Sequence, residues 1–492
     1  MELVRRAADF GQNTAIVSND SSYSYAELLK FSANIAANIL KGKADLSESR
    51  IAFLVSPSFE YVATQWGIWR AGGIAVPLCV KHPLPSMEYV LMDTDASMII
   101  ADKDCVNFIR PLAAKCNIPL YNYDELRSEQ NTTLPDIELE RRAMILYTSG
   151  TTSKPKGVVS QHRHVQAQIE TLVKAWEWEE KDRILNVLPL HHVHGIINVL
   201  TCALWSGASC EFLPGFDPGR VWERIASGDL SLFMGVPTMY YQLISRWESC
   251  TNEEQKQMSE AASQLRLMVS GSAALPVPVL EKWRSITNHT LLERYGMTEI
   301  GMGLSNPYRG ERRPGHVGLP LEGVELVLLN EDKEVVNEGE AGEIHVKGPS
   351  VFEEYWNKPE ATSEAFTEEG WFKTGDIAVF NKGSYKILGR DNLDIIKSGG
   401  YKISALEIED ELRNHKHIDD CAVVGIPDPE WGEVVAAALI SDEDIPDFES
   451  ITISLKEKLP SYKLPRKYIV VKKLPRNVLG KVTKAELKEL FH

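Results

Sequence analysis

Between residues 14 and 140, short apolar runs alternate with segments of helical periodicity. Runs typical of buried strands occur at residues 50–55, 74–78 and 97–101, whereas the segment 25–40 carries apolar residues at helical spacing. Strands and helices that alternate at this pace form βαβ units, in which the strands are parallel. We therefore predict an α/β fold with a mainly parallel sheet. The 492 residues exceed the roughly 250–300 that one core can organise, so more than one domain is expected.

The pattern changes twice further along the chain. From Val324, short strands separated by turn residues predict an accessory β-subdomain within the large domain. The polar segment that follows Arg390 marks a domain boundary, and the tail after it predicts a small α/β domain. We place the N-terminal domain at residues 1–389, the connection at 390–394 and the C-terminal domain at 395–492.

Composition excludes several classes of function. With 53 Lys and Arg against 69 Asp and Glu the net charge is −16, which argues against nucleic-acid binding and favours attraction of cations such as Mg²⁺. The seven cysteines are scattered and form no C-x-x-C pair. That pattern predicts free thiols in a reducing compartment and no zinc site.

Targeting signals are also missing from the sequence. No run of 18 or more apolar residues occurs, so no membrane span is predicted. The first residues lack the apolar region of a secretory signal and the composition of a transit peptide. We expect a cytoplasmic protein, or a mitochondrial one if a longer precursor exists. The sequence gives no indication of the oligomeric state.

A polar stretch follows the strand-like run at residues 143–146. It reads Tyr147-Thr148-Ser149-Gly150-Thr151-Thr152-Ser153-Lys154-Pro155-Lys156-Gly157. Hydroxyls and exposed backbone N–H groups donate hydrogen bonds to phosphate oxygens, and lysines neutralise their charge. The stretch therefore predicts a polyphosphate-binding loop, although its spacing is not that of a Walker A loop. The alternative is a polar surface turn.

Two other enzyme classes find no support. Ser272 lies in no G-x-S-x-G segment, so a serine hydrolase is not indicated. Gly301 and Gly303 do not extend to G-x-G-x-x-G, so a Rossmann dinucleotide site is not indicated either. The apolar runs at 231–238 and 265–272 end in small or polar residues, and both ends should face the site because ligands of α/β sheets gather at the carboxyl ends of strands.

The order of residues in the loop resembles the phosphate-binding signature of the adenylate-forming superfamily, which includes acyl-CoA synthetases, luciferases and peptide-synthetase adenylation domains. Further segments resemble this superfamily's motifs in the same order, and the resemblance covers essentially the whole chain. They are Tyr295-Gly296-Met297-Thr298-Glu299, Thr374-Gly375-Asp376, Gly389-Arg390 and the segment that contains Lys481. The resemblance implies a small C-terminal domain that moves about a hinge at 390–394.

It also implies a role for each matched residue. Tyr295 would stack on adenine, Thr298 would contact the nucleotide phosphate, and Glu299 would hold Mg²⁺. Asp376 would bond the ribose hydroxyls, and Arg390 would contact ribose or phosphate. The candidate catalytic residues are Lys481, Thr298 and Glu299, and Thr151 is a second candidate metal ligand. The other candidates are Thr148, Ser149, Gly150, Thr151, Thr152, Ser153, Lys154, Pro155, Lys156, Tyr295, Asp376 and Arg390 for ATP, and Asn392, Lys397, Gly399 and Gly400 for CoA and the hinge.

Three histidines lie close together at His191, His192 and His194. A metal site is one interpretation, but no carboxylate or cysteine follows at ligand spacing and H-E-x-x-H is missing. The resemblance implies instead that His192, with His194 two residues on, lines the acyl pocket. Lys481 would enter the site for the adenylation step and leave it afterwards.

Arg294, directly before Tyr295, bears on the choice of acid. Many members of the superfamily carry a neutral or acidic residue there, and a guanidinium would pair with a second carboxylate on the substrate. The segment that contains Arg294, the histidine segment at 191–194 and the segment that contains Lys481 together resemble the corresponding segments of malonyl-CoA synthetases. The resemblance implies that malonate, ATP and CoA give malonyl-CoA, AMP and pyrophosphate, with ATP, Mg²⁺ and CoA as cofactors or co-substrates.

Other interpretations stay open at this point. The chain could activate methylmalonate or oxalate, load a carrier protein, or bind nucleotide without turnover. Arg294 could also be structural and pair with Glu293 or another acidic residue.

Overall fold

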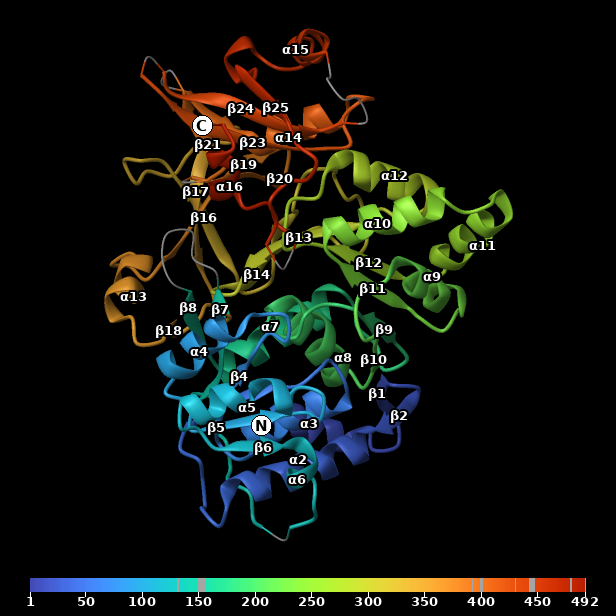
Figure 1. Cartoon of the computed structure of the whole chain (residues 1–492), viewed down its shortest axis with the longest axis vertical. Coiled ribbons are helices and arrows are strands. Elements are labelled where there is room, and N and C mark those ends of the chain that lie inside the picture. The colour runs from blue at the N-terminus through green and yellow to red at the C-terminus, as the bar shows by residue number, and fades with distance from the viewer. Residues whose placement is uncertain are drawn as a thin grey trace.

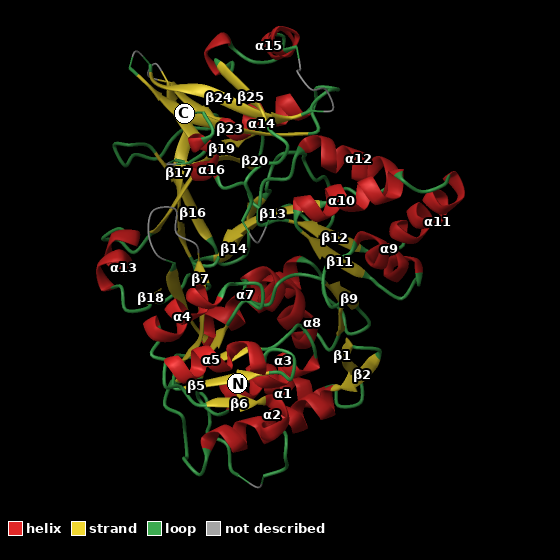
Figure 2. Cartoon of the chain, viewed as in Figure 1, coloured by secondary structure: helices red, strands yellow, loops and turns green. Residues whose placement is uncertain are grey.

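The structure is a computed structural model. It describes residues 1–130, 132–148, 155–391, 393–398, 401–429, 431–441, 447–477 and 480–491, without the side chain of Lys402. The strands form two large mixed sheets, a four-stranded sheet and a five-stranded sheet. The five-stranded sheet with β23, β24 and β25 lies at the end of the longest axis opposite to β5 and β6 (Figures 1 and 2). The predicted α/β class is confirmed. No helix among these residues is long and apolar enough to cross a membrane.

The seven-stranded sheet holds most of the early strands, in the order β18-β8-β7-β4-β3-β5-β6. Its parallel strands are β3 (Arg50–Leu54), β4 (Ile74–Pro77), β5 (Met98–Ala101), β6 (Leu120–Asn122) and β7 (Arg142–Thr148). Two antiparallel strands complete one edge, β8 (Lys156–Gln161) and β18 (Glu354–Tyr355). The three strands predicted from apolar runs in this region are therefore confirmed.

The nine-stranded sheet has the order β15-β14-β13-β12-β11-β9-β10-β1-β2. Its parallel strands are β1 (Thr14–Ser18), β9 (Arg183–Asn186), β10 (Ser209–Phe212), β11 (Leu232–Gly235), β12 (Leu267–Ser270) and β13 (Leu292–Met297). The antiparallel strands are β2 (Ser21–Ser24), β14 (Gly301–Ser305) and β15 (Leu319–Pro320). The carboxyl ends of β11, β12 and β13 consequently lie at one edge of the sheet.

Helices share a core with the inner faces of both large sheets. They are α1 (Glu2–Asp9), α2 (Tyr25–Leu40), α3 (Phe59–Arg70), α6 (Tyr123–Leu126), α7 (His162–Ala175), the π-helix η1 (His194–Thr201) and α8 (Cys202–Trp205). Helix α2 begins at Tyr25 because the Ser24 side chain accepts a hydrogen bond from the backbone of Glu27, which caps its first turn. The core includes Trp66 and Trp176, each at most 1% exposed, and burial of a large apolar side chain contributes about 1.5–3 kcal/mol.

Other helices cover the outer faces of the sheets. Those beside the nine-stranded sheet are α9 (Pro218–Ala226), α10 (Pro237–Glu248), α11 (Asn252–Ser263) and α12 (Val277–Thr287). Those beside the seven-stranded sheet are α4 (Leu84–Asp93) and α5 (Val106–Lys115). Strand β12 shows why both faces must be covered: Leu267 and Val269 join the inner core, whereas Met268 between them joins the outer one.

The accessory subdomain is an antiparallel sheet, as predicted from Val324 onward. Its strands are β16 (Glu325–Leu329), β17 (Ala341–Lys347), β19 (Phe372–Asn381) and β20 (Ser384–Arg390). Helix α13 (Pro359–Ala365) lies between β18 and β19 in sequence. Because β20 ends at Arg390 and the next strand begins at Ile395, the predicted connection at 390–394 joins two different sheets.

The C-terminal residues form a five-stranded sheet with apolar clusters on both faces. Its strands are β21 (Ile395–Ser398), β22 (Tyr401–Ser404), β23 (Asp420–Asp428), β24 (Gly432–Ile440) and β25 (Lys467–Val470). The helices are α14 (Ala405–Arg413), α15 (Phe448–Lys456), the 3₁₀ helix η2 (Ser461–Lys463) and α16 (Lys484–Glu489). Helix α14 begins at Ala405, because the Ser404 side chain caps its first turn by accepting a hydrogen bond from the Glu407 backbone.

Candidate active site

The predicted ribose-binding residue Asp376 lies between two other predicted nucleotide ligands. The Tyr295 hydroxyl donates to Asp376 Oδ2 at 2.6 Å, and Arg390 Nε donates to Oδ1 at 3.2 Å. Antiparallel pairing of β19 with β20 sets Asp376 opposite Arg390. Burial raises the pKa of Asp376, and the positive charge of Arg390 opposes that rise. The structure thus brings together three residues that the sequence separates widely.

Glu299 and the phosphate-loop lysine meet through a tyrosine. The Tyr355 hydroxyl donates to Glu299 Oε1 at 2.9 Å, and the Lys156 ammonium lies 4.8 Å from the centroid of the Tyr355 ring. Lys156 pairs with Thr148 across β7 and β8, and the Thr148 hydroxyl lies 3.5 Å from the Lys156 carbonyl oxygen. Thr298 is half-buried in the same turn as Glu299. Tyr355 belongs to no motif in the sequence, so it was not predicted.

The chemistry of Glu299 fits a magnesium ion. The side chain is 5% exposed, and burial raises the pKa of its carboxyl while the bond from Tyr355 opposes that rise. Among the described residues no lysine or arginine forms an ion pair with it. A buried carboxylate without a cationic partner is a suitable oxygen ligand for Mg²⁺ that also contacts phosphate.

Part of the predicted site lies outside the described residues. These positions are Ser149, Gly150, Thr151, Thr152, Ser153 and Lys154 in the phosphate loop, and Asn392, Gly399 and Gly400 near the domain boundary. Pro155 is described, and its carbonyl oxygen accepts a hydrogen bond from the Tyr89 hydroxyl at 2.9 Å. Lys397 is exposed, with its ammonium 3.3 Å from Asp391 Oδ2. The structure therefore places Lys397 beside the connection between the sheets.

A second group of residues forms where β12, β13 and η1 approach one another. The Ser272 hydroxyl lies 3.2 Å from His194 Nδ1, and Arg294 Nη2 donates to the same hydroxyl oxygen at 3.3 Å. Ser272 has φ +69°, a left-handed conformation that costs a non-glycine residue about 1–2 kcal/mol. Gly271 is needed beside it, because a Cβ there would lie 2.5 Å from Cζ and Nε of Arg294. Burial holds the pKa of His194 well below its usual value, and the charge of Arg294 adds to the effect.

Arg294 is a buried cation without a countercharge. Its side chain is 3% exposed, and its Nε has no hydrogen-bond partner. Burial lowers its pKa to about 9. No carboxylate in the described part of the chain forms an ion pair with it, and Glu293 instead accepts from the Leu275 backbone at 3.1 Å. An uncompensated buried charge is unfavourable, so this guanidinium favours the arrival of an anion.

The burial of the Glu293 carboxyl should make the stability of the protein depend on pH. It is 5% exposed, Oε2 lacks a partner, and burial raises the pKa of its carboxyl from 4.5 to about 8. Since the folded protein holds this proton more tightly than the unfolded chain does, stability is lost as pH rises between these values. Glu293→Gln should remove that loss. The free energy of unfolding in urea should therefore rise relative to the parent protein by about 2 kcal/mol between about pH 6 and pH 8. An unchanged difference would show that Glu293 is ionised throughout.

His192 faces the C-terminal domain. Burial lowers its pKa to about 4, and the nearby positive charge of Lys481 adds to this effect. The rings of His191 and His192 are tilted by 49° with 4.0 Å between their centroids, and the centroids of His191 and His82 are 5.5 Å apart. The three histidines therefore have different neighbours. Of the three, only His194 contacts Ser272, whose hydroxyl also accepts a hydrogen bond from Arg294.

Lys481 reaches this site from the C-terminal domain. A Cβ on the preceding Gly480 would lie 3.3 Å from Thr238 Oγ1 at the start of α10, so this segment lies against the large domain. The Lys481 side chain is exposed, yet the surrounding protein lowers the pKa of its ammonium, as does the charge of Arg390, while Asp376 opposes both. Because solvent still reaches the ammonium, it screens this effect. Lys481 therefore feels the charges of Arg390 and Asp376, predicted to bind the nucleotide, and of Arg294, predicted to bind the acid.

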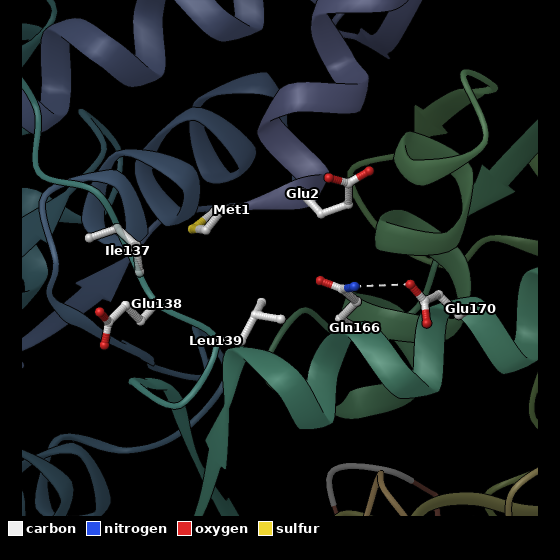
Figure 3. A pocket seen from close by; sticks show the side chains of 7 residues that line it. All are labelled: Met1, Glu2, Ile137, Glu138, Leu139, Gln166 and Glu170. Atoms are coloured by element: carbon white, nitrogen blue, oxygen red, sulfur yellow. Dashed lines mark hydrogen bonds between the residues drawn. The ribbon is translucent and has the colours of Figure 1, made fainter.

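A surface hollow of about 400 Å³ lies elsewhere (Figure 3). Its lining comprises Met1, Glu2, Ile137, Glu138, Leu139, Gln166 and Glu170. Gln166 donates to Glu170 at 2.9 Å across one side of it. The three carboxylates would repel the anionic substrates predicted for this chain, and none of the predicted site residues lies there.

Comparison with known proteins identifies the family of the chain. Residues 3–356 match the family described as AMP-binding enzyme, and residues 407–481 match the AMP-binding enzyme C-terminal domain. The chain is 43% identical over 527 residues to the mitochondrial malonate–CoA ligase ACSF3 of Xenopus laevis, covering 99% of this chain and 91% of that protein.

Two solved structures are also similar. ATP-bound MatB from Rhodopseudomonas palustris superposes with a TM-score of 0.91 at 32% identity, over 100% of this chain and 98% of that one. A malonyl-CoA ligase ternary product complex with methylmalonyl-CoA and AMP gives 0.70 at 34% identity, over 95% and 97%. Since the family matches cover both the large and the small domain, the chain belongs to the AMP-binding enzyme family.

Proposed function

We propose that this chain is an ATP-dependent acid–CoA ligase whose acid is malonate. The observation that carries the substrate is the buried, unpaired guanidinium of Arg294 beside Ser272 and His194. A malonate molecule presents one carboxylate for reaction and a second for recognition, and the second would supply the missing countercharge. The similarity to a protein named malonate–CoA ligase supports the same acid.

In the first half-reaction, a malonate carboxylate oxygen attacks the α-phosphorus of ATP and pyrophosphate leaves. A carboxylate is a weak nucleophile, so this step depends on in-line placement and neutralised charge. Lys156, Arg390 and Lys481 supply positive charge around the nucleotide, while Asp376 accepts from the ribose. Mg²⁺ held by Glu299, with Thr151 as a second proposed ligand, would neutralise phosphate charge.

In the second half-reaction, the CoA thiol attacks the acyl carbon of the adenylate and AMP leaves with the bonding electrons. The proposed mechanism requires Lys481 to leave the site before the thiol enters, so the C-terminal domain at 395–492 should rotate about residues 390–394 relative to the domain at 1–389. The TM-score of 0.91 against an ATP-bound enzyme and of 0.70 against a CoA-product complex supports two domain arrangements. Lys397, Asn392, Gly399 and Gly400 would then adjoin the CoA path.

An acid-dependence assay tests this function. Pyrophosphate release should require an added acid, and CoA consumption should follow only with acids that were adenylated. Malonate should give the highest kcat/KM in a panel that includes oxalate, methylmalonate, succinate, acetate and butyrate. Chelation of divalent cations should stop pyrophosphate release, and Mg²⁺ should restore it. Equal activity with butyrate and malonate would contradict the proposed acid, and pyrophosphate release without CoA consumption would favour a carrier-loading domain.

The location in the cell remains as predicted from the sequence. A cytoplasmic protein is our proposal, and a mitochondrial one is the alternative, in keeping with the name of the Xenopus relative.

A further inference from the structure

Three potential metal ligands meet beside the acyl residues. One ligand atom each from Cys79, His82 and His191 lies within 4.8 Å of the other two. Cys79 and His82 follow β4 in the seven-stranded sheet, whereas His191 follows β9 in the nine-stranded sheet. The cluster therefore bridges the loops of the two large sheets.

The distances between the three ligand atoms would suit a tetrahedrally coordinated ion after a small movement of the side chains. Zinc binds sulfur at about 2.3 Å and imidazole nitrogen at about 2.0–2.1 Å, so its ligand atoms are about 3.5 Å apart. An approach of about an ångström would close the cluster. His191 Nε2 is buried without a hydrogen-bond partner, so this ring has a nitrogen that protein groups leave unused. A metal bond to the cluster would offset part of the cost of burying that ring.

The Cys79 sulfur also accepts hydrogen bonds from its own loop. It is 5% exposed, and burial raises the pKa of its thiol. The backbone N–H groups of Lys81 and His82 donate to the sulfur and oppose that rise. Hydrogen bonds of this kind orient a thiolate ligand and stabilise its charge. Lys81 is exposed, and its positive charge lowers the pKa of both Cys79 and His191. This charge would also repel a bound metal ion.

We propose that Cys79, His82 and His191 form a binding site for a Zn²⁺-class cation. A thiolate and two imidazoles are ligands that favour Zn²⁺ or Co²⁺ over Mg²⁺. On binding, the Cys79 thiol releases its proton to solvent, the sulfur and the two imidazole nitrogens each donate an electron pair, and water fills the fourth position. No electron transfer takes place. This zinc site differs from the proposed magnesium site at Glu299 both in its ligands and in its position in the fold.

Occupancy would fix the segment around His191. This residue directly precedes His192, whose pKa the charge of Lys481 lowers, so the ion would restrain the segment that carries the proposed acyl-pocket residue His192. Because an ion that binds only the folded protein stabilises it, the thermal midpoint should rise with Zn²⁺ whether or not the acid is malonate. This consequence makes the site testable without any measurement of activity.

The test uses the reduced, metal-stripped full chain without ATP. Co²⁺ should bind in one equivalent and produce a sulfur-to-cobalt charge-transfer band, and Zn²⁺ should bind at about micromolar concentration, abolish that band and raise the thermal midpoint. Cys79→Ser should remove the band and weaken Zn²⁺ binding by about 10²-fold or more. His82→Asn should keep the band but weaken binding.

Two matched variants serve as controls. Cys105→Ser changes another free, partly buried cysteine, whose sulfur faces the Ser56 hydroxyl. Glu299→Gln changes the proposed magnesium ligand. Both should retain the cobalt band and the Zn²⁺-induced shift. The proposal is overturned if the parent protein gives no band, if Cys79→Ser binds Zn²⁺ as tightly as the parent, or if Glu299→Gln loses the binding.

Discussion

Replacing Arg294 with methionine should lower kcat/KM for malonate by about 10²-fold while KM for ATP stays the same. Methionine keeps most of the side-chain volume beside Gly271 but removes the charge. Each charge-assisted hydrogen bond contributes about 1.5–3 kcal/mol, and the loss of about 3 kcal/mol corresponds to the expected factor. The measurement is acid-dependent pyrophosphate release over a range of malonate concentrations.

Butyrate provides the internal control for this variant. It ends in a methyl group, so it gains nothing from the guanidinium and should lose no activity when the charge is removed. Methionine also removes the cost of burying an unpaired cation, so the ratio of malonate to butyrate activity should collapse. If both acids fall by the same factor, Arg294 has a structural role and the proposed acid is wrong.

Gly271→Ala supplies a matched variant that keeps the charge. A Cβ at this position would lie 2.5 Å from Cζ and Nε of Arg294, so the guanidinium must shift although its charge is retained. Selectivity for malonate should then fall as well, because recognition of a carboxylate depends on the direction of the N–H groups.

Much of the fold could be predicted because its signals are local. Helix α2 at Tyr25–Leu40 and strand β3 at Arg50–Leu54 follow directly from apolar periodicity. The π-helix η1 was not predicted, since its bonding depends on buried surroundings that the segment alone does not reveal. The number and order of strands in each large sheet also require long-range pairing.

The site was less predictable because its contacts join distant segments. Motif order placed Asp376 and Arg390 in the nucleotide site, and the register of β19 against β20 explains their meeting. Tyr355 was missed, since a tyrosine in a two-residue strand carries no distinctive pattern. Ser272 was anticipated only as the end of the apolar run at 265–272, without a role. The cluster of Cys79 and His191 was missed for the same reason: the two residues lie on different sheets, and no spacing along the chain links them.

Lys481→Ala should slow acid-dependent pyrophosphate release by about 10²-fold or more, the scale expected when one preorganised charge is lost from a transition state. The charges of Arg390 and Asp376 act on the Lys481 ammonium in this structure, as the proposed role in adenylation requires. Its charge should matter less once pyrophosphate has left and the domain has rotated. Thioester formation from CoA and a supplied malonyl-adenylate should therefore change by less than about threefold.

Two measurements on the same protein decide between a mobile and a fixed role for this lysine. Lys473→Ala, which changes an exposed lysine in the same domain, should leave both half-reactions intact and so controls for general loss of positive charge. If Lys481→Ala slows both half-reactions equally, the lysine stays in the site throughout and the rotation about residues 390–394 has no support. If only adenylation is lost, the cation acts in one half-reaction and must be withdrawn for the other, because the thiol needs the space that its side chain occupies.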